Sequence, residues 1–212
     1  EIQSKGLGMD VKIFNKYGKS ILNQQGELVC TNPFPSMPSK FWNDPNNTKF
    51  KNAYFNKYKN IWHHGDYAEI KNTEGFIIYG RSDTTLNPGG VRLGTAEIYS
   101  VVEKFIEIKE AIVVGQSWDN DVRIILFIIM NKKYKINGTL LDRIKKQIRK
   151  NASPRHVPSK IIAVKDIPRT KSGKIVELAV KNTIEGNKIK NKEALVNPKV
   201  LEEYKNLKEL KK

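Results

Sequence analysis

The sequence predicts an α+β fold in which a β-rich segment is followed by a small α+β domain. Residues 1–82 carry short β-branched and aromatic segments separated by turn residues, as a series of short strands would. Residues 83–185 instead alternate amphipathic and apolar stretches in the order helix, strand, strand, helix, strand, helix. Residues 186–212 form a lysine-rich tail with a helical pattern at 200–210.

The first segment is expected to form strands at 11–14, 26–30, 61–70 and 75–80, with a hairpin loop at 72–75. Prolines in residues 32–38 remove backbone donors and predict a loop there. The aromatic residues of 50–59 are compatible with a short helix or a connector. Because short strands of this total length bury only a thin core, we expect the segment to be the C-terminal edge of a larger, incomplete N-terminal domain.

The second segment is expected to contain three helices and three strands. The apolar positions at helical spacing are Ile98, Val101, Val102 and Phe105 in helix 95–106, Leu140, Leu141, Ile144 and Ile148 in helix 138–151, and Val176, Val180 and Ile184 in helix 174–184. The expected strands are 111–114, 122–130 and 159–164, with a turn at 117–121 between the first two.

Composition narrows the class of protein. With 212 residues, 39% hydrophobic and 28% charged, the chain has the composition of a globular protein rather than a disordered one. Its longest apolar run, 124–130, is too short to span a bilayer. The single cysteine, Cys30, excludes an internal disulfide framework and a cysteine-rich zinc site, so we expect a reducing, cytoplasmic compartment and no metal ligands in this chain.

The net charge of +16 favours an anionic partner, either a nucleic acid, a membrane surface or a phosphate-rich small molecule. The lysines are spread along the chain, and no zinc-finger, RRM or KH signature accompanies them. A solvated lysine-rich surface therefore explains most of the charge, and we expect neither a nucleic acid nor a membrane as partner.

Three segments carry residues suited to chemistry. The first is the sequence His-His-Gly-Asp that ends at Asp66, where a carboxylate at a strand could accept hydrogen bonds from a ribose diol or simply cap a turn. The second, residues 80–94, places Arg81 and Arg92 around a glycine-rich stretch that includes Gly89 and Gly90. Glycine allows close approach of a ligand and arginine suits phosphate, although a hairpin loop with solvated arginines fits equally well.

The third segment, residues 168–174, is a Ser-Gly-Lys turn that presents Lys174 just before an expected helix. Such a lysine can stabilise negative charge developing on phosphorus or on a carboxylate oxygen. The spacing is not that of a P-loop, and an exposed loop lysine without a ligand is the simpler interpretation of this segment alone.

In order and spacing, these segments resemble the closing motifs of the adenylate-forming acyl-CoA synthetase superfamily. Within it the chain is most similar to the acetoacetyl-CoA synthetases. The residues that carry this resemblance are Trp62-His63-His64-Gly65-Asp66-Tyr67, Gly80-Arg81-Ser82-Asp83, Thr85-Leu86-Asn87-Pro88, Gly90-Val91-Arg92, Glu97-Ile98-Tyr99 and Arg155-His156-Val157-Pro158-Ser159. The resemblance covers nearly the whole chain.

For the nucleotide, the resemblance implies that Asp66 binds the ribose hydroxyls of ATP and that Arg81 lies near the nucleotide. Arg92 would contact the phosphate of the adenylate. Asp83 would be the hinge about which residues 83–185, a small mobile lid domain, rotate. Thr84 stands where the family often has an acidic or small residue, which would change the torsion at the hinge.

For the chemistry, the resemblance implies that Lys174 is the adenylation lysine. Gly89 and Gly90 would bind CoA, with Gly90 lining the pantetheine tunnel, and Arg149 would bind the CoA phosphate. The implied reaction converts ATP, acetoacetate and CoA to acetoacetyl-CoA, AMP and diphosphate. The implied cofactors are ATP or AMP, CoA and Mg²⁺, whose site would lie mostly upstream of this chain.

The family's pyrophosphate-binding loop and carboxylate pocket have no counterpart in these 212 residues, which begin with Glu1. We therefore expect the chain alone to be inactive and to partner the missing N-terminal part, within one longer protein or as a separate chain. A non-catalytic remnant and, further removed, a basic nucleic-acid-binding module are the alternatives. The last of these predicts DNA binding that weakens steeply with salt.

Overall fold

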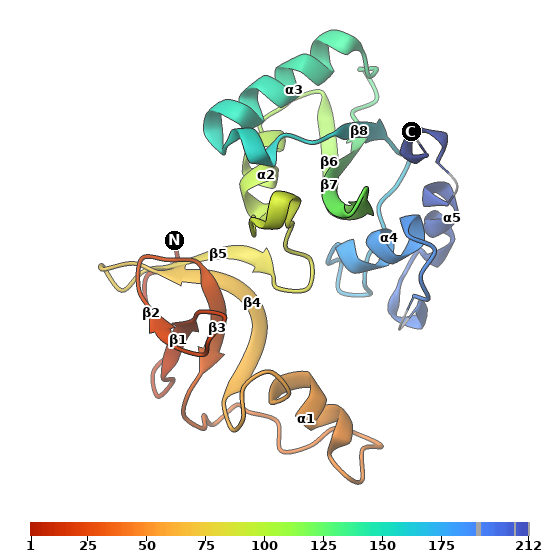
Figure 1. Ribbon diagram of the computed structural model, residues 1–212. Helices are drawn as coiled ribbons and strands as arrows, with labels where there is room; N and C mark the ends of the chain where they lie inside the picture. The colour runs from red at the N-terminus through yellow and green to blue at the C-terminus, as the bar shows by residue number, and fades with distance from the viewer. Residues whose placement is uncertain (190–191, 206, 212) are drawn as a thin grey trace. The chain divides into compact units, whose positions relative to one another are not determined.

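The computed structural model describes residues 1–189, 192–205 and 207–211. The chain divides into two compact units, Glu1–Asp83 and Thr84–Lys212 (Figure 1). In the described part of both units, no helix has the length and apolar character needed to cross a membrane.

The first unit is built on a five-stranded antiparallel sheet with the order β2-β1-β3-β4-β5. Its elements are β1 (Val11–Phe14), β2 (Ser20–Ile21), β3 (Gly26–Cys30), α1 (Thr48–Tyr54), β4 (Trp62–Ile70) and β5 (Phe76–Arg81). The four expected strands are confirmed. The two-residue β2 was not predicted, because it is too short to show an alternating pattern.

Aromatic packing attaches α1 to the sheet. The Tyr54 ring stacks on the Trp62 ring of β4 with 3.7 Å between centroids, and Phe50 and Phe55 both approach the same indole edge-on. The aromatic residues of segment 50–59 therefore lie in a short helix and in the connector after it, and they cover one end of β4.

The second unit is an α+β domain built on a three-stranded sheet with the order β6-β7-β8 (Figure 1). Strands β6 and β7 are antiparallel, and β8 runs parallel to β7. The main elements are α2 (Thr95–Val102), β6 (Ile108–Trp118), β7 (Asp121–Met130), α3 (Gly138–Asn151), β8 (Lys160–Ala163), α4 (Glu177–Ile184) and α5 (Leu201–Tyr204). Short 3₁₀ turns occupy Pro88–Gly90, Pro154–His156, Lys192–Ala194, Pro198–Val200 and Lys208–Leu210.

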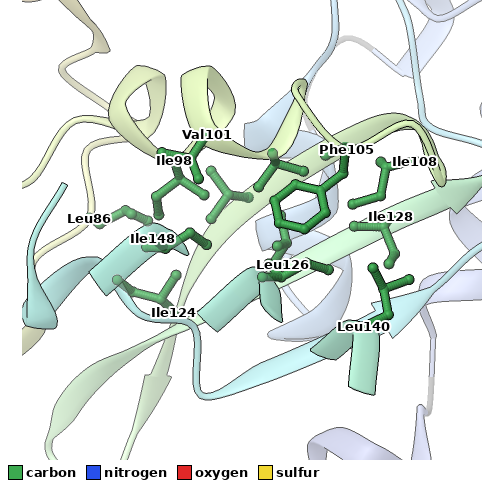
Figure 2. Close-up of a cluster of buried hydrophobic side chains, with 14 of the residues drawn as sticks. Leu86, Ile98, Val101, Phe105, Ile108, Ile124, Leu126, Ile128, Leu140 and Ile148 are labelled. Atoms are coloured by element: carbon green, nitrogen blue, oxygen red, sulfur yellow. The ribbon is translucent and has the colours of Figure 1, made fainter. Parts of the chain in front are cut away.

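Strand β7 is apolar from residue 124 to residue 130 because both faces of that stretch are covered. Leu126 and Ile128 face a core closed by α2 and α3, as Figure 2 shows with Ile98, Leu140 and Ile148 around them. The alternate residues of β7 face a second core that α4, α5 and the last 3₁₀ turn close. That second core contains Ile112, Val114, Ile125, Phe127, Ile129, Ile162, Val164, Ile167, Val180, Tyr204 and Leu210.

The structure changes three of the expected boundaries. Helix 95–106 ends at Val102, and Phe105 reaches the core from the turn that follows. The turn between β6 and β7 is only Asp119 and Asn120, both at positive φ (51° and 59°), so the flanking strands are longer than expected. Helix 174–184 begins at Glu177.

The described residues beyond 185 belong to the second unit and are not an independent tail. Tyr204 is fully buried, and its ring meets that of Phe127 edge-on with 4.9 Å between centroids. The Tyr204 hydroxyl donates to the backbone carbonyl of Asp166 (2.8 Å). The C-terminal segment is thereby attached to the loop that follows β8.

Candidate functional site

Asp66 and Arg81 lie opposite each other in the first unit because β4 and β5 pair in the register Asp66↔Arg81. Arg81 Nη1 lies 3.5 Å from Asp66 Oδ1 and donates to the His64 carbonyl at 3.3 Å. The other carboxylate oxygen, Oδ2, contacts His64 Nδ1. Two motifs that are separate in the sequence therefore form one charged cluster at this edge of the sheet.

Gly65 makes room for this cluster. Its φ is +84°, and a Cβ built at this position would lie 2.8 Å from Arg81 Nη2. A side chain at residue 65 would therefore strain the backbone and displace the guanidinium from Asp66.

The environment of Asp66 favours its ionised form. Partial burial raises the pKa of the carboxyl, but the hydrogen bond with His64 and the charges of His64 and Arg81 outweigh it, so the net pKa is lowered from the ordinary 3.8. Asp66 is therefore a carboxylate at neutral pH and can only accept hydrogen bonds.

We expect His64→Ala to raise the pKa of Asp66, because His64 supplies the largest of the favourable contributions. With the folded-state pKa below 3.8, ionised Asp66 stabilises the native state above about pH 4, and this contribution is lost as the pH falls through the folded-state pKa. Carbon-13 NMR titration of the carboxyl measures the shift. His63→Ala is the matched control, because His63 contacts Glu27 instead; an equal pKa in His64→Ala and the parent would contradict the assignment.

Glu27, which the sequence analysis did not select, organises the segment before Asp83. Its side chain is 2% exposed and accepts from Lys57 Nζ (2.5 Å), lies 2.9 Å from His63 Nε2, and accepts from the Ser82 hydroxyl. Asp83 itself lies in a turn after β5, half-exposed, with its Oδ1 3.6 Å from Arg81 Nε. The residue before Asp83 is thus fixed to the sheet while the Asp83 side chain faces solvent.

The twin-glycine turn, Asn87–Gly90, lies on the surface of the second unit. Gly89 and Gly90 both have left-handed φ angles (58° and 75°), and a Cβ added to either would meet nothing within 4 Å. The Gly89 N–H donates to both carboxylate oxygens of Asp121, at 2.8 and 3.0 Å. Beside it, a groove of about 620 Å³ is lined by Asn87, Gly90 and the tip of the β6–β7 hairpin.

Arg92 and Arg149 lie on separate surface segments of the second unit. Arg92 is exposed just after the twin-glycine turn. Arg149 is exposed in the last turn of α3, next to Lys150, while Ile148 of the same turn is buried in the core. The amphipathic pattern of α3 thus places Arg149 and Lys150 in solvent.

Lys174 lies in a tight turn and not in the helix that the apolar spacing suggested. The Thr170 N–H donates to the Lys174 carbonyl (2.9 Å), and the Lys174 N–H donates to Thr170 Oγ1 (3.1 Å). Gly173, at φ +82°, closes the turn. The side chain of Lys174 is exposed, and none of the ion pairs found among the described residues includes it.

A partly buried hydrogen-bond chain connects the helix after this turn to the rest of the domain. The hydroxyl of Tyr99 on α2 donates to Glu177, the first residue of α4, and accepts from the Val113 N–H at 3.1 Å. Burial, with the nearby Glu177 charge, raises the pKa of Tyr99 well above its ordinary value, so the hydroxyl remains a neutral donor.

The described residues contain no group of three or more His, Cys, Asp or Glu side chains that could hold a metal ion.

Residues 97–174 match the family model of the AMP-binding enzyme C-terminal domain. The whole chain is 55% identical over 211 residues to acetoacetyl-coenzyme A synthetase of Rhizobium meliloti (strain 1021) and 48% identical over 212 residues to acetoacetyl-CoA synthetase of Xenopus tropicalis. It spans 32% of the length of each, and 100% and 99% of the chain are covered.

Among solved structures, the chain is similar to acetoacetyl-CoA synthetase from Streptomyces lividans, with a TM-score of 0.91 and 38% identity. That match covers 99% of this chain and 32% of the other. The chain is therefore homologous over its whole length to a C-terminal portion of acetoacetyl-CoA synthetases.

Proposed function

We propose that this chain is the C-terminal part of an acetoacetate–CoA ligase, which converts ATP, acetoacetate and CoA to acetoacetyl-CoA, AMP and diphosphate. The observation that carries the proposal is the exposed Lys174 side chain on a hydrogen-bonded turn, within the residues that match the AMP-binding enzyme C-terminal domain. Homology to ligases that form acetoacetyl-CoA supplies the substrate class.

In the first half-reaction, a carboxylate oxygen of acetoacetate attacks the α-phosphorus of ATP. The new O–P bond forms as the bond to diphosphate breaks, giving acetoacetyl-AMP. Lys174 neutralises the negative charge that accumulates on the transferring group. Because its ammonium is strongly hydrated and bears three donors on a flexible stem, it can follow the charge as it moves between oxygens.

For the nucleotide, Asp66 and the two arginines have complementary roles. Ionised Asp66 accepts hydrogen bonds from the ribose diol, and Arg81, already beside it, fixes the carboxylate and lies near the nucleotide. Exposed Arg92 contacts the phosphate of the adenylate.

In the second half-reaction, the thiol sulfur of CoA attacks the acyl carbon of acetoacetyl-AMP, the thiol loses its proton, and AMP leaves. We assign Gly89 and Gly90 to the surface that admits the thiol, and Arg149 to the CoA phosphate. The second unit, which begins at Thr84, moves as a lid about Asp83 between the two half-reactions, and this movement withdraws Lys174 after the first. The fixed Ser82 and the solvent-facing Asp83 side chain support a pivot at this point.

The test is a chimera in which this chain replaces the segment of the Rhizobium meliloti synthetase with which it aligns. We expect the chimera to release pyrophosphate from ATP only when acetoacetate is present, and to form acetoacetyl-CoA when CoA is added. The chain alone is expected to release none. A folded chimera without acetoacetate-dependent pyrophosphate release would overturn the proposed function.

A further inference from the structure

We propose that the C-terminal segment Leu195–Tyr204 is a brace that positions the lysine loop, here defined as residues 165–174, and that Asn197 is its central positioning residue. The inference rests on the proposed function, since it concerns how Lys174 is placed for adenylation. It assigns a function to a segment whose sequence indicates a lysine-rich tail with a helical pattern.

Asn197 makes three hydrogen bonds to consecutive parts of the loop. Its Oδ1 accepts from the Arg169 N–H (3.0 Å), while its Nδ2 donates to Asp166 Oδ2 (2.7 Å) and to the Ile167 carbonyl (2.9 Å). Every hydrogen-bonding atom of this half-buried amide is therefore used on the lysine loop. An alanine at this position would leave two backbone groups of the loop without their partner.

The neighbours of Asn197 extend the contact along the loop. The Val196 N–H donates to the Arg169 carbonyl (2.9 Å), and Leu195 forms an antiparallel bridge with Thr170. At the other end, Tyr204 donates to the Asp166 carbonyl and is anchored in the core. The loop is thus bound along its length by a segment about thirty residues later in the chain.

Arg169 transmits this constraint to the turn that bears Lys174. Its Nη1 donates to the Gly173 carbonyl (3.2 Å), and its Nη2 contacts Glu110 of β6. The backbone of Arg169 is thereby held by the C-terminal brace, and its side chain holds the residue directly before Lys174. Removing the brace would free the backbone of Arg169 and so loosen the position of the Lys174 ammonium.

A flexible lysine would still bind ATP electrostatically but would spend less time where charge develops. Displacement of a catalytic group by about 1 Å can cost up to about 100-fold in rate even when the mutation is distant from the chemistry. The brace should therefore affect the rate constant of adenylation and leave the KM for ATP nearly unchanged.

The experiment uses the chimera described above, in parent, Asn197→Ala and Asn187→Ala forms. Asn187 is an exposed asparagine whose amide contacts Glu185, away from the lysine loop, and is the matched control. We expect Asn197→Ala to lower kcat for pyrophosphate release about 10- to 100-fold with little change in KM for ATP. Thioester formation from supplied acetoacetyl-AMP and CoA should remain at the parental rate, because that step does not use Lys174.

Amide hydrogen exchange in the same samples should show faster exchange at Arg169 and Thr170 in Asn197→Ala only. If the parent chimera is inactive, the proposed function fails. If the parent is active and Asn197→Ala releases pyrophosphate at the parental rate, the brace is wrong while the proposed function stands. Equal loss of both half-reactions would show a general defect in folding and would also overturn the positioning role.

Discussion

Lys174→Ala is expected to abolish pyrophosphate release by the chimera, with a fall in rate of at least about 100-fold. In other enzymes, the removal of one donor that stabilises developing charge has an effect of this size. The reason is that, in the proposed function, the ammonium of Lys174 neutralises the negative charge that develops on the transferring group. Thioester formation from supplied acetoacetyl-AMP should continue at the parental rate. Radiolabelled pyrophosphate release and thioester absorbance measure the two half-reactions separately.

Lys171→Ala is the matched control for Lys174→Ala. Lys171 is an exposed lysine of the same turn, so its loss removes the same charge from the same loop. We expect pyrophosphate release to change little in Lys171→Ala. A comparable fall in both variants would mean that the overall charge of the loop, rather than the position of Lys174, supports adenylation.

Helix α3 shows which features the sequence determines locally. Its expected bounds, Gly138–Asn151, agree with the structure. The Asn137 side chain accepts from the Leu140 N–H, which caps the first turn, and Leu140, Ile144 and Ile148 are buried at the expected spacing. Capping and periodicity are short-range signals, so a single sequence is sufficient to locate such a helix.

The start of α4 could not be located in this way. Val176 and Val180 have helical spacing, but the residues before them turn back, since Arg169 and Ile175 form an antiparallel bridge and Gly173 has a positive φ. The apolar pattern continues without a break from the turn into the helix. Periodicity alone therefore extends the helix backward to Lys174.

The long-range polar contacts could not be predicted from the sequence, for a different reason. The motifs identified Asp66 and Arg81 separately, and the strand register then brought them together. No comparable pattern marks Glu27, or the contact between Asn197 and the backbone of Arg169. Which separated polar groups meet is decided by tertiary packing, and a single sequence carries no local signal for it.

Gly90→Leu is expected to impair the half-reaction that Lys174→Ala spares and to spare the one that Lys174→Ala impairs. A Cβ at residue 90 meets nothing within 4 Å of this chain, so a leucine side chain would extend into the open space beside the turn. If that space admits the CoA thiol, thioester formation should fall by at least about 100-fold, because a misplaced nucleophile loses its near-attack geometry. Single-turnover pyrophosphate release should stay within a few-fold of the parent.

The matched control for Gly90→Leu separates steric blocking from backbone strain. Gly186 has nearly the same φ as Gly90 (72° against 75°), and a Cβ there also meets nothing within 4 Å. Gly186→Leu therefore imposes a similar left-handed strain at a residue that does not line the groove beside Gly90. We expect Gly186→Leu to retain thioester formation. If the two variants lose it equally, strain explains the effect and Gly90 does not face CoA; if neither loses it, the thiol approaches elsewhere.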